Sequence, residues 1–352
     1  MSKGVAMASI RGEEQGVGAV TGDPGTNGVR PTGHCPFADS IRTQVGRTVV
    51  GQDVVVERVL IALLTGGHLL LEGVPGIAKT LMVQSVAKAI DLSFARVQFT
   101  IDLLPADILG AEILEQRTGT FRVHKGVVFT NLLLADEINR ASPKVQSALL
   151  EAMQERRVSI GEATHDLPAP FIVIATQNPV EQAGTFELPE AQLDRFMMRH
   201  RLTYPTPEEE AEVVRRSVAL KLKRQGEGAV PMSAFDSITN DAPQRVGDLT
   251  EAMSKVQEVH VSDVFVRDCV ELVGLTRSHE AIELGCSPRA ALALVHASRA
   301  RAYISGRDYV IPEDIFALAE DVMLHRMRLN YEALAEGRQG AEVLREILER
   351  LT

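Results

Sequence analysis

The sequence predicts an α/β fold in which a parallel sheet flanked by helices is followed by an all-helical domain. Short, fully apolar runs alternate with segments of helical spacing up to about residue 204, a pattern typical of parallel strands covered on both faces. After Tyr204-Pro205-Thr206-Pro207 the spacing stays helical to the end. At roughly 150 residues per domain, 352 residues are enough for about two domains.

The elements of the first domain follow one another with little interruption. In chain order we expect a helix at 38–48, a helix at 53–65, a strand at 68–72, a helix at 79–90, a strand at 94–99, a helix at 104–110, a strand at 127–135, a helix at 142–155 and a strand at 171–176. Two segments break the alternation and predict hairpins: 111–126, turning at Thr118-Gly119-Thr120, and 156–168, turning near Gly161.

The domain boundaries follow from changes in composition. Residues 1–36 hold eight of the 27 glycines and no sustained apolar period, which predicts a disordered tail. Residues 37–204 form the α/β core, with the two hairpins as inserts. Residues 205–239 predict a helix starting at Pro207, followed by a linker or exposed loop around Arg224–Pro231. Residues 240–352 form the helical domain.

Composition excludes several classes of protein. The net charge of −10 opposes duplex binding driven by bulk charge. Three cysteines without CxxC spacing exclude a disulfide framework and a cysteine-rich zinc module, and they favour a reducing compartment. No apolar run approaches the ~20 residues of a membrane span, and the start lacks the apolar region of a signal peptide. We therefore expect a cytoplasmic protein.

The segment LLLEGVPGIAKT (69–80) predicts a phosphate-binding loop between a strand and a helix. Backbone N–H groups in such a turn bind anions, and the helix start adds positive potential. Lys79 would reach the terminal phosphates and the Thr80 hydroxyl would ligate Mg²⁺. Ala78 stands where the usual pattern has glycine. The predicted nucleotide-binding residues of this loop are Gly73, Val74, Pro75, Gly76, Ile77, Ala78, Lys79 and Thr80.

A second motif, NLLLADEINR (131–140), ends an apolar strand in two adjacent carboxylates. The carboxyl ends of parallel strands meet at one edge of the sheet, so this pair should lie beside the phosphate-binding loop. Asp136 would hold Mg²⁺ through its water shell, and Glu137 would orient the attacking water.

Three further polar residues are candidates for the same chemistry. Asn178 follows the strand of FIVIATQNP (171–179) and could contact the γ-phosphate or the water. In LPEAQLDRF (188–196), Leu193 and Phe196 would pack while Asp194 and Arg195 face outward, and Arg195 could serve a neighbouring subunit's phosphate site. Arg289 begins a helix of the second domain and could reach nucleotide across the cleft between domains.

Together these motifs resemble the AAA+ ATPases, and among them the MoxR-type family. The resemblance covers about 300 residues, from near Val49 to the C-terminus. It is carried by VVGQDVVVERVLIALLTGGHLLLEGVPGIAKT (49–80), LLLADEINRASPKVQSALLEAMQERRVSIG (132–161), ATQNPVEQAGTFELPEAQLDRF (175–196) and GCSPRAALAL…GRDYVIPEDI (285–294 and 306–315). Alanine before the lysine is usual in this family, so Ala78 supports the resemblance.

The resemblance implies roles that spacing alone does not. Val49, Val50 and Gly51 would border the adenine, Asn178 would be sensor 1, Arg195 the arginine finger and Arg289 sensor 2. Whether Arg289 acts on its own subunit's nucleotide or on its neighbour's stays open. The helical domain would be the lid. The two hairpins would face the channel of a ring, commonly a hexamer. Such rings use ATP/ADP and Mg²⁺, act as chaperones on protein clients, and typically work with a von Willebrand factor A-domain partner.

The alternative function is that of an AAA+ nucleic-acid motor. Such a motor should carry hairpins rich in cations and aromatic side chains. The hairpins here contain Arg117, Arg122, Lys125, Arg156 and Arg157. Each also contains acids, and Phe121 is their one aromatic residue, which favours a protein client. A scaffold with little turnover is disfavoured because Glu137, Asn178 and Arg195 are all present.

Overall fold

A five-stranded parallel sheet lies at the centre of the first domain of the computed structural model, which describes residues 33–74, 76–117, 119–179, 184–226, 228–238 and 244–351. The strands are β1 (Leu69–Glu72), β2 (Phe94–Gln98), β5 (Leu132–Asp136), β8 (Ile172–Gln177) and β9 (Met198–Arg201). Their spatial order is β2-β5-β8-β1-β9, with every neighbouring pair parallel. Because all strands run the same way, their carboxyl ends share one edge of the sheet.

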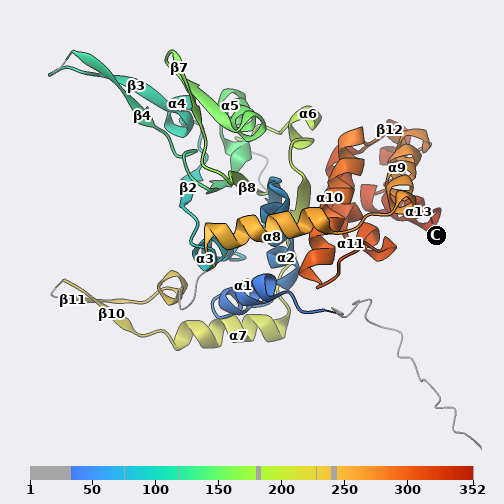
Figure 1. Ribbon diagram of the computed structural model, residues 1–352, viewed down its shortest axis with the longest axis horizontal. Helices are drawn as coiled ribbons and strands as arrows, with labels where there is room; N and C mark the ends of the chain where they lie inside the picture. The colour runs from blue at the N-terminus through green and yellow to red at the C-terminus, as the bar shows by residue number, and fades with distance from the viewer. Residues whose placement is uncertain are drawn as a thin grey trace, which may run out of the picture. The chain divides into compact units, whose positions relative to one another are not determined.

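The apolar strands pack on both faces because alternate side chains point to opposite sides. Leu69 and Leu71 of β1 belong to one core cluster, and Leu70 belongs to the other. The first face is covered by α1 (Pro36–Gly46), α2 (Asp53–Thr65) and α3 (Lys79–Ala89). The second face is covered by α4 (Pro105–Leu109) and α5 (Pro143–Glu155). This layering confirms the predicted sheet flanked by helices (Figure 1).

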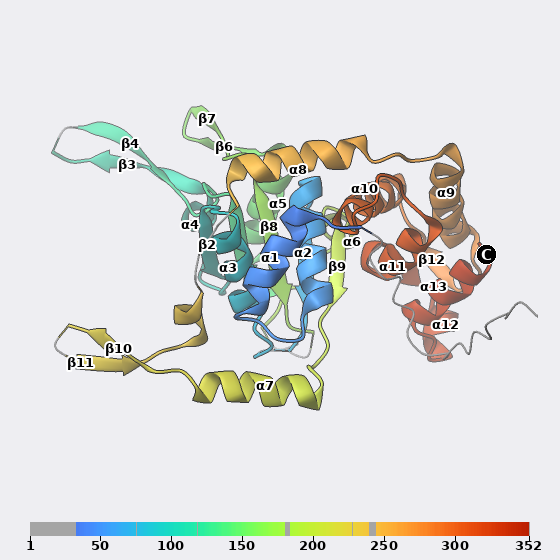
Figure 2. The same ribbon diagram turned by 60° about the horizontal axis from the view of Figure 1, so that its bottom comes forward.

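Both predicted hairpins are present and extend from the same side of the domain (Figures 1 and 2). The first pairs β3 (Gly110–Glu115) with β4 (Thr120–Lys125). The second pairs β6 (Arg157–Ile160) with β7 (Ala163–Asp166) and turns at Gly161, whose φ is +61°. Two short helices lie in connecting segments. Helix η1 (Ile138–Arg140) follows β5, and helix α6 (Glu190–Leu193) precedes β9.

The connection between the two domains contains more regular structure than the sequence predicted. Helix α7 (Pro207–Val218) is capped by Thr206, whose hydroxyl accepts a hydrogen bond from the Glu209 amide, as expected for an N-cap. The predicted linker or loop at Arg224–Pro231 is wrong, because β10 (Leu222–Gln225) and β11 (Gly228–Pro231) form an antiparallel hairpin. Figure 2 shows α7 leading into that hairpin. A short helix, η2 (Ala234–Ser237), follows.

The second domain is helical, with a small two-stranded ribbon added. Its helices are α8 (Val246–Glu258), α9 (Asp263–Ser278), α10 (Pro288–Ile304), α11 (Pro312–Met323), η3 (Leu324–Arg326), α12 (Tyr331–Ala335) and α13 (Gly340–Glu349). Strands β12 (Ile282–Leu284) and β13 (Arg328–Leu329) pair antiparallel between them, which the all-helical prediction did not include. In the described ranges, no helix combines the length and the apolar character that crossing a membrane requires.

Three boundaries differ from the sequence predictions. Most of the predicted tail lies outside the described residues, but Cys35 is only 4% exposed and packs in the core, so ordered structure starts inside residues 1–36. The predicted strand 127–135 begins only at Leu132. Strand β9 was not predicted, because its sequence Met-Arg-His-Arg lacks an apolar run.

Candidate functional site

The loop after β1 has the backbone shape of an anion-binding turn. Gly76 and Ala78 both have left-handed backbones, with φ of +87° and +58°, and α3 begins directly at Lys79. Such turns direct successive N–H groups toward a bound anion. A Cβ atom on Gly73 would lie 2.7 Å from Ile77 Cδ1 and 3.1 Å from Leu202 Cβ, so a side chain at this position would have to displace these neighbours. Pro75 lies outside the described residues.

The Lys79 side chain lies within its own loop. Its Nζ donates a hydrogen bond to the carbonyl oxygen of Gly73 at 2.7 Å. Burial lowers the pKa of Lys79, while the nearby carboxylates of Asp136 and Glu137 act in the opposite direction. The structure therefore brings together the lysine and the acidic pair, as the sequence predicted.

Asp136 ends β5 and is held by two neighbouring strands. Thr176 Oγ1 of β8 donates to Asp136 Oδ1 at 2.5 Å, and Arg96 Nη2 of β2 donates to Oδ2 at 2.6 Å. Sequence reasoning missed both partners. The signal for Arg96 was a charged residue inside a short strand, but only the β2–β5 pairing brings it to Asp136.

Glu137 occupies a left-handed backbone conformation with φ of +56°. This conformation costs a non-glycine residue roughly 1–2 kcal/mol. Its amide donates to Thr176 Oγ1 at 2.9 Å, so one buried hydroxyl orders both acidic residues. Its carboxylate accepts from Gln98 Nε2 and pairs with Arg140 Nε, each at 2.9 Å. Backbone strain of this kind is common at functional sites.

Asn178 lies one residue beyond the end of β8, between the other two motifs. It is buried, with 6% of its surface exposed. Strand β8 runs between β5 and β1, and the Gly73 amide donates to the Gln177 carbonyl at 3.2 Å. Asn178 therefore lies just beyond the carboxyl end of β8, between the start of the phosphate-binding loop and Asp136.

An apolar cleft of about 610 Å³ opens beside the loop. Val49 and Val50, which the resemblance predicts beside the adenine, line it together with Ile77 and Ala78. Gly51 does not line this cleft: it is packed beneath the Glu209 carboxylate, which a Cβ atom there would meet at 2.3 Å.

The outer wall of this cleft comes from the connection between the domains. It contains Tyr204, Val213, Val214, Leu220 and Met232. Helix α7 is fixed to the core by Arg216, whose Nη1 donates to the carbonyl oxygens of Gly46 and Arg47 at 2.8 and 3.1 Å. Sequence reasoning missed this wall. Its one signal was the pair of adjacent valines, Val213 and Val214, on a helix that is mostly polar.

Arg195 follows α6, away from the loop residues. It lines a cleft of about 300 Å³ with side chains of α5, among them Ser147 and Glu151. Within the part of the chain that the structure describes, no side-chain hydrogen bond or ion pair holds the Arg195 guanidinium.

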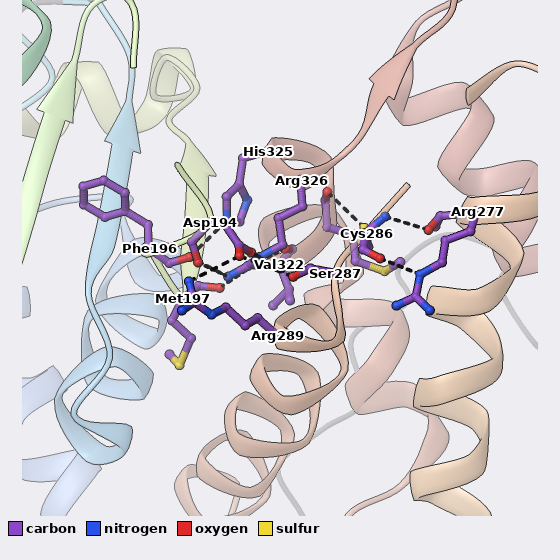
Figure 3. A network of polar contacts seen from close by, with 12 residues as sticks. Asp194, Phe196, Met197, Arg277, Cys286, Ser287, Arg289, Val322, His325 and Arg326 are labelled. Carbon is purple, nitrogen blue, oxygen red and sulfur yellow. Dashed lines mark hydrogen bonds and ion pairs between the residues drawn. The ribbon is translucent and has the colours of Figure 1, made fainter. Parts of the chain in front are cut away.

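Arg289 lies beside this segment. Its Nη1 is 3.5 Å from Asp194 Oδ2. The expectation that Asp194 faces outward is wrong. Its carboxylate accepts from Ser287 and Arg326 of the second domain, and it lies in the polar network of Figure 3.

A lysine in a glycine-containing loop between strand and helix, next to paired carboxylates on a neighbouring strand, is typical of a P-loop nucleotide-binding protein. The family model described as "ATPase family associated with various cellular activities (AAA)" matches residues 68–198, and the model "AAA lid domain" matches residues 274–347.

Individual proteins give the same result. The chain is 44% identical to Chaperone MoxR1 of Mycobacterium tuberculosis over 87% of this chain and 79% of that protein. It is also 44% identical to the uncharacterized protein YeaC of Bacillus subtilis, over 89% of this chain and 93% of that one. A solved structure of a candidate ATPase from Cytophaga hutchinsonii matches with a TM-score of 0.79 and 44% identity, over 89% and 94% of the two chains. The chain belongs to the MoxR family of AAA+ ATPases.

Proposed function

We propose that this protein binds ATP at the loop 73–80 and hydrolyses it to ADP and phosphate. The observation that carries the proposal is the meeting of Lys79, Asp136, Glu137 and Asn178 at one sheet edge. The donor set fits a magnesium ion, because a hydroxyl and a carboxylate oxygen are ligands that Mg²⁺ prefers. Thr80 and Asp136 would hold it, and the ion would neutralise charge on the phosphates.

Each of these residues has a part in the reaction. Lys79 would exchange its hydrogen bond to Gly73 for the terminal phosphates, and the loop amides would bind the remaining oxygens. Glu137 would orient the attacking water, with its carboxylate placed by Gln98 and Arg140. Asn178 would contact the γ-phosphate or the water. The adenine would enter the cleft between Val49, Val50 and α7.

The proposed active form is a ring, commonly a hexamer in this family. Arg195 has no side-chain partner among the described residues, and Arg289 lies next to it on Asp194. This placement favours both arginines acting on the nucleotide of a neighbouring subunit, where a guanidinium stabilises the transition-state charge. Head-to-tail contacts of this kind close into rings.

The ring would remodel protein complexes as a chaperone. The β3–β4 hairpin exposes Ile113, Leu114 and Phe121, the last with 69% of its surface exposed. Exposed apolar side chains suit a protein client, whereas stacking of nucleic-acid bases requires several aromatic residues. The family resemblance also suggests a partner with a von Willebrand factor A domain. The three cysteines are unpaired and buried, which fits a reducing, cytoplasmic compartment.

A Glu137→Gln trap tests the proposed function directly. The purified variant, loaded with ATP and Mg²⁺, should retain protein clients that the Lys79→Ala variant does not retain, since only the former binds ATP. Single-stranded DNA should leave ATP turnover of the wild-type protein unchanged at physiological salt. Strong stimulation by the DNA would favour the nucleic-acid motor instead.

A further inference from the structure

Arg326 of the lid is buried against the turn that carries Arg195. It ends η3, and only 3% of its side chain is exposed. Its Nε donates to Asp194 Oδ1 at 2.8 Å, its Nη2 to the Phe196 carbonyl at 2.7 Å, and its Nη1 to the Met197 carbonyl at 3.2 Å. Nη2 also lies 3.2 Å from the Asp194 carbonyl oxygen. One guanidinium therefore binds the residue before Arg195 and the two residues after it (Figure 3).

Three other side chains of the lid contact the same turn, and one of them is Arg289, whose Nη1 lies 3.5 Å from Asp194 Oδ2. Ser287 Oγ donates to the Asp194 carboxylate at 3.2 Å. His325 Nε2 lies 3.1 Å from the Phe196 carbonyl oxygen, and burial lowers its pKa well below the usual value, so the ring is neutral and Nε2–H donates. The turn is thus held by hydrogen bonds from the lid, while the Arg195 guanidinium has no partner among the described residues.

The arrangement is rigid for an electrostatic reason. A buried guanidinium loses its hydrogen bonds to water, and hydrogen bonds to protein acceptors in fixed positions must replace them. Arg326 finds them in one carboxylate and in backbone carbonyls, including that of Val322 in its own domain. A planar fork with several donors fixes both distance and orientation, which a lysine ammonium does not. A shift of the lid relative to 194–197 would leave these groups unpaired.

We propose that Arg326 is a positioning residue for Arg195, and that through it the lid and the Arg195 turn move as one body. This inference rests on the proposed function, in which Arg195 serves the neighbouring subunit's ATP. A displacement of the lid would then move Arg195 relative to the nucleotide site of the neighbouring subunit. Loss of Arg326 should impair the neighbour's hydrolysis and leave nucleotide binding in its own subunit intact.

The first test is the kinetics of Arg326→Lys in the full-length assembled protein. Turnover number should fall at least tenfold, while the KM for ATP and the affinity for a fluorescent ATP analogue stay within threefold of wild type. Arg338→Lys is the matched control, because Arg338 pairs with Glu346 inside the lid and lies apart from the Arg195 turn. It should turn over normally. A weakened affinity in Arg326→Lys with unchanged turnover would overturn the inference.

Rings that contain two different variants distinguish misplacement of Arg195 from a defect in the variant's own nucleotide site. Arg326→Lys mixed with Lys79→Ala should recover about one quarter of wild-type turnover, because random assembly gives one productive interface in four. The Lys79→Ala subunit then supplies an intact Arg195 to an intact nucleotide site. Arg326→Lys mixed with Arg195→Ala should recover nothing, because both lack a working finger. The opposite pattern would place the defect in the variant's own site and overturn the inference.

A reference mixture distinguishes failure of this inference from failure of the proposed function. Lys79→Ala with Arg195→Ala should recover turnover if Arg195 acts across the interface, and its failure would reject the proposed function itself. Recovery there without recovery in the Arg326→Lys mixture with Lys79→Ala would reject only the positioning role. If Arg326→Lys does not assemble, Asp194→Asn replaces it in the same mixtures with the same expected pattern, since it removes the charge that Arg326 pairs with while keeping an acceptor.

Discussion

The side-chain amide of Gln98 donates a hydrogen bond to the carboxylate of Glu137 at 2.9 Å, across the junction of β2 and β5. The same carboxylate oxygen, Oε2, also pairs with Arg140, whose Nε lies at 2.9 Å. Glu137 is therefore held in one orientation on a backbone that is itself strained. A residue placed so strictly is expected to be sensitive to small chemical changes, which makes it the first target for mutation.

Glu137→Gln should keep ATP binding and lose hydrolysis. The amide is nearly the same size as the carboxylate but cannot orient and polarise water as an anion does, so turnover should fall by about 100-fold or more. Steady-state phosphate release and equilibrium binding of an ATP analogue measure the two effects. Glu336→Gln, on the lid surface, is the control. Turnover within threefold of wild type would show that Glu137 is not the catalytic residue.

Lys79→Ala should abolish ATP binding, because the ammonium that would meet the terminal phosphates is lost. Lys88→Ala removes an exposed lysine from the end of the same helix and should bind ATP normally. Both variants should unfold at similar temperatures, since the Lys79 hydrogen bond to Gly73 is a single contact. Calorimetric titration with ATP decides the point. An unchanged affinity of Lys79→Ala for ATP would show that the nucleotide does not bind at this loop.

Val214→Asp tests whether α7 borders the adenine. Val214 lines the apolar cleft, and a carboxylate there would lose hydration against the base. The KM for ATP should rise about tenfold, which corresponds to about 1.4 kcal/mol. Val218→Asp places the same charge on the same helix at a position that is 80% exposed and outside the cleft wall. Equal KM values for the two variants would place the adenine elsewhere.

His68 should make stability depend on pH between about 6.5 and 4. Its Nδ1 accepts from the Val173 amide and its Nε2 lies 3.2 Å from the Met153 carbonyl, and burial lowers its pKa to about 4. The unfolded chain takes up this proton near pH 6.5, so the free energy of unfolding falls as pH drops through this window. At one pKa unit per 1.36 kcal/mol, the loss approaches about 3 kcal/mol.

The matched variant for this pH effect is His68→Gln, which does not titrate. Urea unfolding at several pH values should show wild type more stable at pH 7, with the difference between the two proteins shrinking toward pH 4.5. A difference that stayed constant over the whole range would contradict a buried neutral histidine.

The sequence predicted those parts of the site that are local in the chain. The loop 73–80 and the Asp136–Glu137 pair are each a few residues long, and their spacing carries the chemistry. Strands β1, β5 and β8 were recognisable because a strand buried on both faces is apolar at every position. The short edge strand β9 has no such signal.

Contacts between distant segments could not be predicted in this way. Asp194 and Arg326 are 132 positions apart, and Arg96 and Asp136 are 40 apart. Arg96, Asp194 and Arg326 had no local signal of a partner, because nothing in the sequence beside them indicates one, and the motif of Asp136 does not indicate Arg96. Asp194 was therefore expected to face solvent. The part of the cleft wall that α7 supplies could not be predicted for the same reason, since it depends on where a connecting helix packs.

The central claim is that hydrolysis requires two subunits, one binding ATP and one supplying Arg195. The most direct measurement is turnover per subunit against protein concentration, with the mass of the assembly recorded in the same solutions. Turnover should rise in step with the assembled fraction and approach zero for the isolated chain. An isolated chain that hydrolyses ATP at the full rate would contradict this account.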